Sequence, residues 1–290
     1  MKRKQEPTVH LLLSGLVIGE SPRWHEGRLW FSNWGAQEII AVDVEGNSEV
    51  VTSVPTTIPF SIDWLPDGRL LVVSGPEALL LRREPDGSLV IHADLSSLAR
   101  GWNEIVVDGR GNAYVNGSNF DFLGGGEFTP GIIALVTPDG SVRQVADGIA
   151  FPNGMTVTPD NSTLIVAESF ASRLTAFDIA SDGSLSNRRV WAELGQGGDG
   201  ICLDAEGAVW CSATKDGKPT CVRVREGGQV LQTIELDRSC FACMLGGEDG
   251  KTLFMMAAEW RGTENMDVLL HSHTGQVLTA LAPAPHAGWP

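Results

Sequence analysis

Short apolar segments follow polar turns at a regular spacing along this chain. Six segments share the pattern, in which a turn containing glycine or asparagine leads directly into an apolar run: HEGRLWFSN, LPDGRLLVVS, DGRGNAYVNG, TPDNSTLIVAES, DAEGAVWCSA and EDGKTLFMMAA. Their turn residues are Gly27, Gly68, Gly111, Asn161, Gly207 and Gly250, which are 41, 43, 50, 46 and 43 residues apart. A period of about 40 to 50 residues made of turns and strands is typical of radial β arrays, whose units must pack on one another to bury their apolar faces.

A second series of polar turns alternates with the first. Its glycines lie in the sequences VEG, PDG, PDG, SDG, EGG and HTG: Gly46, Gly87, Gly140, Gly183, Gly228 and Gly275. Glycine supplies the positive φ that such turns need, so each repeat is predicted to contain two hairpin-like turns and, with the connection to the next repeat, four strands. Six such units predict an all-β fold, a six-bladed β-propeller with four antiparallel strands per blade.

The repeats run along nearly the whole chain, so residues 1–290 are predicted to form a single domain, with ordered blades over about 9–280. The apolar run near the N-terminus is expected to supply the outer strand of the last blade and close the ring. Residues 1–8 and the tail from about Leu281 are expected to be frayed or loosely packed.

The N-terminal run is not expected to be a signal peptide, because Pro7 and His10 interrupt it and no small-residue cleavage site follows. No stretch approaches the roughly 18 apolar residues of a membrane span. These features favour a cytoplasmic protein with no membrane partner.

The net charge of −15 disfavours nucleic acid as a partner, since phosphate binding relies on Lys and Arg. The charge suits a bound cation, although solubility alone explains most acidic residues. Of the five cysteines, Cys240 and Cys243 have CxxC spacing, but no second CxxC completes a zinc site. Buried thiols are the prediction, and a redox or metal role is the alternative.

Counting back from the first series of turns locates the candidate chemistry. Equivalent residues at the start of each innermost strand meet near the axis of a propeller. Seven or eight residues before the turn residue, four of the six repeats carry an oxygen-bearing side chain: Glu20, Asn103 (followed by Glu104), Asn153 and Asp199. The second and sixth repeats have Phe60-Ser61 and Ala242-Cys243 instead.

This ring of oxygen donors, without His or Cys, predicts a site for Ca²⁺, Mg²⁺ or Mn²⁺. Asn153-Gly154 and Asp199-Gly200 are also common turn dipeptides, so each of them alone has a structural explanation. The recurrence at one register in four repeats favours the metal site.

Four motifs resemble the senescence marker protein/gluconolactonase/luciferin-regenerating enzyme family. They are Gly19-Glu20-Ser21-Pro22-Arg23-Trp24, Trp102-Asn103-Glu104, Phe151-Pro152-Asn153-Gly154 and the segment GDGICLD at 198–204, and they occur in the family's order. The segments 245–247 and 251–254 are similar to the family's sixth blade. The resemblance covers nearly the whole chain.

The resemblance implies a six-bladed propeller with one divalent cation on its axis and lactone hydrolysis as the usual activity. Carried over by motif, Glu20, Asn153 and Asp199 correspond to the main metal ligands, and Asn103 to a fourth ligand or a substrate contact. Asp199 also corresponds to the catalytic base. Ca²⁺ is the expected ion, with Mg²⁺, Mn²⁺, Zn²⁺ or Fe²⁺ as alternatives.

The expected substrate contacts are Asn103, Trp102, Asn119 and Arg100. Many sugar lactonases of the family have an arginine two residues before the third-blade asparagine, where this chain has Gly101 and places Arg100 one residue further back. That departure, with the aromatic Trp34, Trp102, Phe120 and Phe122, favours a less polar substrate, although such aromatics also serve as blade packing.

The longest irregular stretch, 116–130, contains three consecutive glycines and is predicted to be either a lid over the channel mouth or a plain loop. His271-Ser-His273 is expected to lie on a surface strand.

The chain has no GxSxG or HExxH motif. Three functions remain open: a metal-dependent lactonase, an esterase or phosphotriesterase on the same scaffold, and a metal-binding regulatory propeller without activity. The substrate is expected to be a small lactone, and the oligomeric state is left open.

Overall fold

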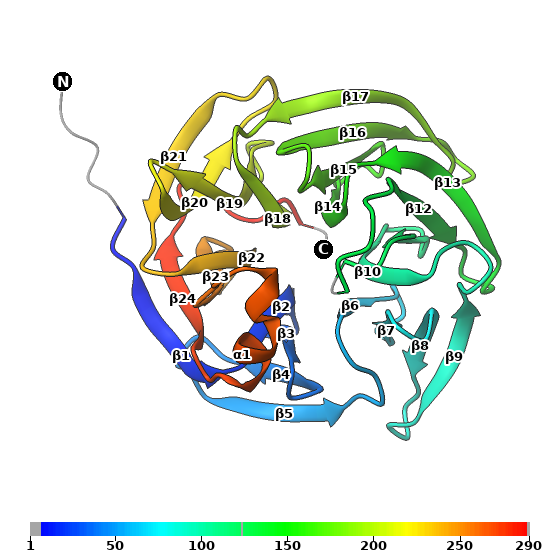
Figure 1. Cartoon of the computed structure of the whole chain (residues 1–290), viewed down its shortest axis with the longest axis horizontal. Coiled ribbons are helices and arrows are strands. Elements are labelled where there is room, and N and C mark those ends of the chain that lie inside the picture. Colours follow the sequence, from blue (N-terminus) through cyan, green and yellow to red (C-terminus); the bar gives the residue numbers. More distant parts are fainter. Residues whose placement is uncertain (1–6, 123, 289–290) are drawn as a thin grey trace.

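Six four-stranded antiparallel sheets are arranged around a central axis, so the chain is a six-bladed β-propeller (Figure 1). The computed structural model describes residues 7–122 and 124–288. Each inner strand contacts the inner strand of both neighbouring blades, which closes the ring. The inner strands are β2 (Ile18–His25), β6 (Phe60–Trp64), β10 (Gly101–Val107), β14 (Pro152–Val157), β18 (Gly197–Leu203) and β22 (Ser239–Gly246).

The other three strands of each blade follow outward from the axis. The second strands are β3 (Arg28–Trp34), β7 (Leu70–Ser74), β11 (Ala113–Ser118), β15 (Thr163–Glu168), β19 (Val209–Lys215) and β23 (Thr252–Ala258). The third strands are β4 (Glu38–Val42), β8 (Leu79–Arg83), β12 (Gly131–Val136), β16 (Arg173–Ile179), β20 (Lys218–Val224) and β24 (Gly275–Leu281). The outer strands are β5 (Ser48–Ser53), β9 (Leu89–Asp94), β13 (Val142–Ile149), β17 (Leu185–Glu193), β21 (Val230–Glu235) and β1 (His10–Leu16).

The predicted ring closure is confirmed. Strand β1 pairs with β24 in the last blade, so the two ends of the propeller are joined by one sheet. All six residues of the first turn series have positive φ, between 56° and 86°, which explains why the sequence places glycine or asparagine there.

The predicted second series of turns is confirmed in five blades, and the prediction is wrong in the sixth. Gly275 does not lie in a turn but begins β24. The last blade needs no turn at that place, because its outer strand comes from the other end of the chain. Its second and third strands are joined by a longer connection that contains a 3₁₀ turn (Thr263–Asn265) and helix α1 (Met266–His271). His271 therefore ends a helix and does not lie on the expected strand.

The apolar core lies mainly between neighbouring blades. Each sheet has side chains on both faces, and within the described residues all six hydrophobic clusters join residues of neighbouring blades. Large side chains such as Trp210, Phe31 and Phe254 are fully buried in these layers. Each such side chain contributes roughly 1.5–3 kcal/mol to the stability of the ring.

The expected looseness of the tail after Leu281 is wrong. Ala282 and Ala284 are buried, and backbone hydrogen bonds tie the tail to the two neighbouring blades, including one from the His286 amide to the Gly250 carbonyl. Burial of small apolar side chains and satisfied backbone groups explains the order of this segment. Of the N-terminal residues expected to fray, 1–6 lie outside the described residues.

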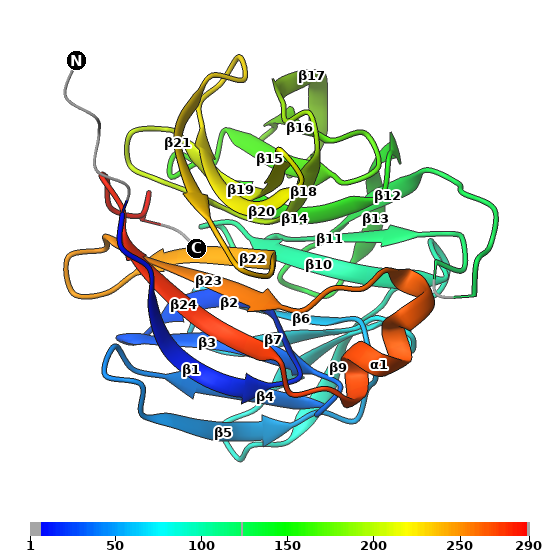
Figure 2. The same ribbon diagram turned by 60° about the vertical axis from the view of Figure 1, so that its left-hand side comes forward.

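The two faces of the ring differ. The inner strands begin at one face, called here the site face, and the first series of turns lies at the opposite face. The connections between second and third strands also belong to the site face. Figure 2 shows α1 and the β11–β12 connection projecting from the site face, with the C-terminal tail on the opposite side.

Candidate axial site

Local irregularities of the inner strands mark the predicted ligand positions. The strand pairing shifts between Glu20 and Arg23 in β2 and between Trp102 and Ile105 in β10. It shifts again between Pro152 and Met155 in β14 and between Gly197 and Ile201 in β18. A bulge leaves residues without a partner across the ladder and turns their side chains toward a new direction. Each of the four candidate ligands therefore lies in or at the edge of a bulge. Strand β6, which carries Ser61, pairs regularly, whereas β22 is bulged between Cys240 and Ala242 although it carries no oxygen donor there.

The glycines that follow two of the ligands have a structural role. Gly154 and Gly200 lie within inner strands and have no positive φ, so the alternative reading as turn dipeptides is wrong. A Cβ on Gly154 would lie 2.6 Å from the carbonyl oxygen of Asp199, and one on Gly200 would lie 2.4 Å from the Cβ of Ala242. Glycine thus allows neighbouring inner strands to approach each other closely where the ligands stand.

The structure brings three of the four predicted ligands together. The Asn153 side chain hydrogen-bonds Asp199, and the charge of Asp199 acts on Glu20. Asn103 lies in the equivalent bulge of β10, where its carbonyl accepts a hydrogen bond of 2.7 Å from the Ser61 hydroxyl. Glu20 is buried, and Asn153 and Asp199 are half-buried.

The carboxyl groups near the axis resist ionisation. Burial, followed by the charge of Glu104, raises the pKa of Asp199 to about 8. Burial, followed by the charges of Asp199 and Glu104, raises the pKa of Glu20 well above its ordinary value. Burial also raises the pKa of Glu104 to about 7, although Arg23 opposes this. Negative charges that lie close together in a dry site destabilise one another.

A second buried layer supports the ring. Arg23 contacts Glu104 and Asp63 at 3.6 Å each and donates a hydrogen bond to the Ile105 carbonyl. The Ser21 hydroxyl lies 3.5 Å from Glu104. Only Arg23 and Glu104 were visible in the sequence motifs. Asp63 was missed, although the alternation of polar residues with Phe60, Ile62 and Trp64 indicates a side chain that faces the channel.

Polar side chains also connect the blades around the ring. Asn116 donates to the Asn153 carbonyl at 2.6 Å and accepts from the Glu104 amide. The Ser169 hydroxyl accepts from Asn153 and donates to the Gly198 carbonyl. The contacts of Asn116 with the Asn153 carbonyl and of Ser169 with the Gly198 carbonyl have no sequence signal, because they join different blades.

A divalent cation fits these residues. Two carboxyl groups and two amide oxygens form a donor set of hard oxygens. Arg23 pairs with two of the four carboxyl groups, Asp63 and Glu104, so ionisation of Glu20 and Asp199 leaves negative charge that a cation can neutralise. Among residues 7–122 and 124–288, no three His, Cys, Asp or Glu side chains converge as a metal site, so such a site depends on Asn103 and Asn153.

The predicted substrate contacts lie in different environments. Trp102 is fully buried in the core between the second and third blades, so its assignment as a substrate contact is wrong. Its ring packs against Gly117, where a Cβ would lie 3.0 Å from the ring. Arg100 and Asn119 are exposed on the site face, where the Asn119 side chain accepts a hydrogen bond of 3.1 Å from the Arg100 amide.

The predicted loop at 116–130 begins later than expected, because residues 116–118 belong to β11 and Asn116 is buried. The loop proper runs from residue 119 to residue 130. In Figure 1 this connection reaches inward over the third blade toward the middle of the ring. A role as a lid stays a prediction.

The prediction of buried thiols is confirmed. All five are free and buried, as predicted, and the sulfurs of Cys202 and Cys243 are 3.9 Å apart between the fifth and sixth blades. Cys243 lies at the position of the sixth blade that corresponds to the oxygen donors of four other blades.

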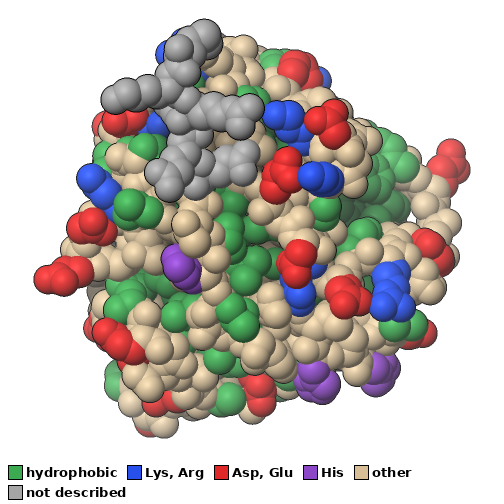
Figure 3. Space-filling view, turned by 90° about the vertical axis from the view of Figure 1, so that its left-hand side faces the viewer, with side chains coloured by type: hydrophobic (Ala, Val, Ile, Leu, Met, Phe, Trp, Pro, Cys, Tyr) green, Lys and Arg blue, Asp and Glu red, His purple; other side chains and the backbone are tan. Residues whose placement is uncertain are grey.

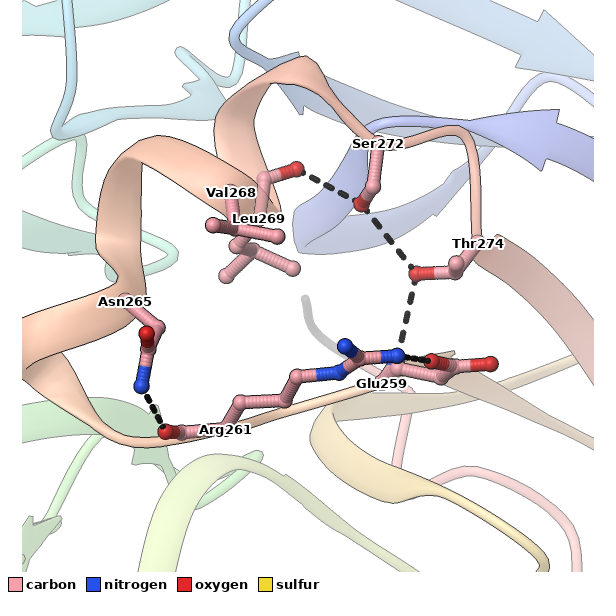
Figure 4. A pocket seen from close by; sticks show the side chains of 7 residues that line it. All are labelled: Glu259, Arg261, Asn265, Val268, Leu269, Ser272 and Thr274. Carbon is pink, nitrogen blue, oxygen red and sulfur yellow. Dashed lines mark hydrogen bonds and ion pairs between the residues drawn. The ribbon is translucent and has the colours of Figure 1, made fainter.

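Two concave places elsewhere contain none of the predicted site residues. A cavity of about 70 Å³ lies at α1, where Figure 4 shows the Arg261–Glu259 ion pair along its lower edge. A groove of about 370 Å³ lies on the opposite face beside the C-terminal tail and includes Trp191 and Asp204.

On the side drawn in Figure 3, outside the grey residues, Lys and Arg side chains are scattered among acidic ones and form no single patch. No helix within the described residues is long and apolar enough to cross a membrane.

Comparison with known proteins agrees with the fold. The family model described as "SMP-30/Gluconolactonase/LRE-like region" matches residues 18–259. The chain belongs to this family. Regucalcin from Xenopus laevis is 27% identical, over 93% of this chain and 95% of the relative.

Two solved structures share the fold at low sequence identity. A luciferin-regenerating enzyme superposes with a TM-score of 0.80 at 18% identity, over 97% of each chain. A gluconolactonase from Xanthomonas campestris gives a TM-score of 0.74 at 22% identity, over 96% of this chain and 90% of the other.

Proposed function

We propose that this protein is a metal-dependent hydrolase that opens a lactone, with a divalent cation bound on the propeller axis. One observation carries the proposal: the oxygen donors Glu20, Asn103, Asn153 and Asp199 all lie in or beside bulges, near the ends at which four inner strands begin. The family, whose description includes gluconolactonase, supports the reaction type. A small-molecule substrate also agrees with the acidic composition.

The donor set favours Ca²⁺. Carboxylate and amide oxygens on four separate strands suit a large, hard cation with flexible geometry, whereas Zn²⁺ and Fe²⁺ more often take nitrogen or sulfur ligands. Mg²⁺ and Mn²⁺ are the nearest alternatives.

A bound cation would polarise the lactone carbonyl and lower the pKa of a nearby water. Asp199 takes the proton of the attacking water, while its hydrogen bond to Asn153 fixes the direction of the carboxylate. The water oxygen bonds to the carbonyl carbon, the ring C–O bond breaks, and the proton passes to the departing alkoxide. The product is a hydroxy acid. The buried ion pairs of Arg23 with Glu104 and Asp63 support the inner strands that carry the proposed ligands.

The test is a hydrolysis screen of metal-stripped protein with a pH indicator, in which Ca²⁺, Mg²⁺, Mn²⁺, Zn²⁺ or Fe²⁺ is restored separately. Acid release from lactones that returns with one ion is expected. Asp199→Asn should lower kcat by roughly 10²–10⁴-fold, whereas the exposed Asp182→Asn serves as the matched control.

The same screen separates the alternatives. A clear preference for aryl esters or phosphotriesters over lactones would identify a different hydrolase on this scaffold. Metal binding without turnover on every substrate would favour the regulatory propeller.

A further inference from the structure

Five phenylalanine side chains from three connections form one cluster on the site face. Phe120, Phe122 and Phe128 belong to the β11–β12 connection, Phe151 precedes β14, and Phe170 follows β15. Phe151 and Phe170 stack with ring centres 4.6 Å apart, and Phe122 lies 4.7 Å from Phe151. Phe128 lies 5.3 Å from Phe170, and Phe120 lies 5.5 Å from Phe128. This set is called the phenylalanine cluster.

The phenylalanine cluster is tied directly to the axial site. Phe151 comes two residues before Asn153, and its carbonyl accepts a hydrogen bond of 3.1 Å from the Ser169 amide. The Ser169 hydroxyl in turn contacts the Asn153 side chain and the carbonyl of Gly198, which precedes Asp199. Ser169 therefore links the stacked rings of Phe151 and Phe170 to the two proposed ligands Asn153 and Asp199.

The surrounding structure holds Phe151 in an unusual conformation. Its φ is 60°, a region that large side chains rarely adopt. The preceding Ala150 amide donates to the fully buried carboxylate of Glu168 at 2.7 Å, and Arg173 and Arg188 pair with the same carboxylate. Strain that the surroundings maintain in this way is typical of functional sites.

The phenylalanine cluster is partly open to solvent. Phe170 is 51% exposed and Phe128 is 42% exposed, and none of the five belongs to the hydrophobic clusters of the blade core. Grouped apolar side chains left exposed beside a polar site mark a place where an apolar ligand group binds. Their rings offer no hydrogen-bond donor or acceptor to the hydroxyl groups of a sugar lactone.

We propose that the phenylalanine cluster binds the apolar substituent of the substrate, so that the preferred lactones carry an alkyl or aryl group in place of several hydroxyl groups. This inference rests on the proposed lactonase function and names its substrate class. Phe170 and Phe128 are the specificity-determining residues, since their rings have exposed surface to offer. The substituent lies against the cluster, and the lactone carbonyl lies toward Asn153 and Asp199.

The experiment measures kcat/KM for γ-butyrolactone, γ-phenyl-γ-butyrolactone, γ-nonalactone and gluconolactone. The phenyl and pentyl lactones are expected to be preferred by at least 10-fold over the other two. Phe170→Ser should lower the ratio of substituted to unsubstituted activity by about 10-fold, mainly through KM, because a ring face buried against a ligand contributes about that factor. Phe170→Leu should retain most of the preference. The control is Leu11→Ser, on the outer strand β1, where Leu11 is 57% exposed. This variant should leave kcat/KM unchanged for both substituted and unsubstituted lactones.

A second readout does not depend on turnover. Calorimetric titration with 5-phenyl-2-pyrrolidinone and with 2-pyrrolidinone, which resist hydrolysis, should show tighter binding of the phenyl compound, and Phe170→Ser should remove that difference. Equal kcat/KM for all lactones, or a preference for gluconolactone, would overturn the inference while leaving the lactonase intact. If no lactone is hydrolysed, the proposed function fails, and the lactam titration still decides whether the phenylalanine cluster binds an apolar group. A change of oligomeric state in Phe170→Ser, with ligand preference unchanged, would assign the cluster to contacts between copies and would also overturn the inference.

Discussion

Binding of a divalent cation at the axial site should release protons. In the metal-free protein, burial and the charge of Glu104 raise the pKa of Asp199 to about 8, and Glu20 is raised in the same direction. At pH 7 a group with that pKa holds about 0.9 proton. A cation that needs the carboxylate form must displace this proton, and it also favours ionisation of Glu104 nearby. Between about one and two protons per cation should therefore be released at pH 7.

The same pKa fixes the size of the pH effect. For a single group titrating near 8, the apparent affinity at pH 6 is about 90-fold weaker than at pH 9, which corresponds to about 2.7 kcal/mol. If Glu20 also releases a proton, the dependence becomes steeper. For Asp199 alone, the affinity should therefore rise about ninefold from pH 6 to pH 7 and about fivefold from pH 7 to pH 8.

Isothermal titration of Ca²⁺ into metal-stripped protein at pH 6, 7, 8 and 9 measures the affinity. Titration in two buffers with different heats of ionisation gives the number of protons released. Asp199→Asn should bind more weakly and release fewer protons, whereas Asp182→Asn should behave as the native protein. A constant affinity between pH 6 and pH 8, or binding without proton release, would refute the reasoning.

Four further outcomes test the structure. Without metal, the free energy of unfolding should fall as pH rises from about 4 to 8, because the raised pKa of Asp199 favours its protonated form in the folded state; thermal melts with and without Ca²⁺ should show this loss and its reversal. Gly154→Ala should shift the inner strands apart and weaken Ca²⁺ binding more than 10-fold, measured by the same calorimetry, whereas Gly125→Ala should leave Ca²⁺ binding unchanged, because a Cβ there meets no atom within 4 Å. Glu168→Ala should cost roughly 2–3 kcal/mol in urea unfolding, because it leaves the Ala150 amide and two arginines without their partner; a loss below 0.5 kcal/mol would contradict the assigned role. Deletion of the residues after Leu281 should lower the melting temperature by several degrees, since it removes backbone hydrogen bonds and two buried alanines, and an unchanged melting temperature would speak against this docking.

Much of the fold was visible in local sequence features. Turn residues with positive φ are most often glycine or asparagine, as in all six turns of the first series, so the repeat length and the blade count followed from their spacing. The positions of Glu20, Asn153 and Asp199 at the starts of inner strands also followed, because a strand has a nearly constant rise per residue. Counting back from the turn therefore reached the same level in each blade.

Contacts between blades were not visible in the sequence. The full burial of Trp102, the docking of the tail and the layer formed by Arg23, Asp63 and Glu104 depend on segments far apart in the chain. The phenylalanine cluster likewise joins three connections from two blades.

The sequence by itself determined a six-bladed ring with oxygen donors at one register, because turns and strand length are local properties. Only the tertiary structure decided which donors lie in bulges of the inner strands, how strongly their charges interact and which apolar side chains lie beside them. Those properties arise from burial and from side chains brought together by ring closure, and no periodic pattern along one strand contains them.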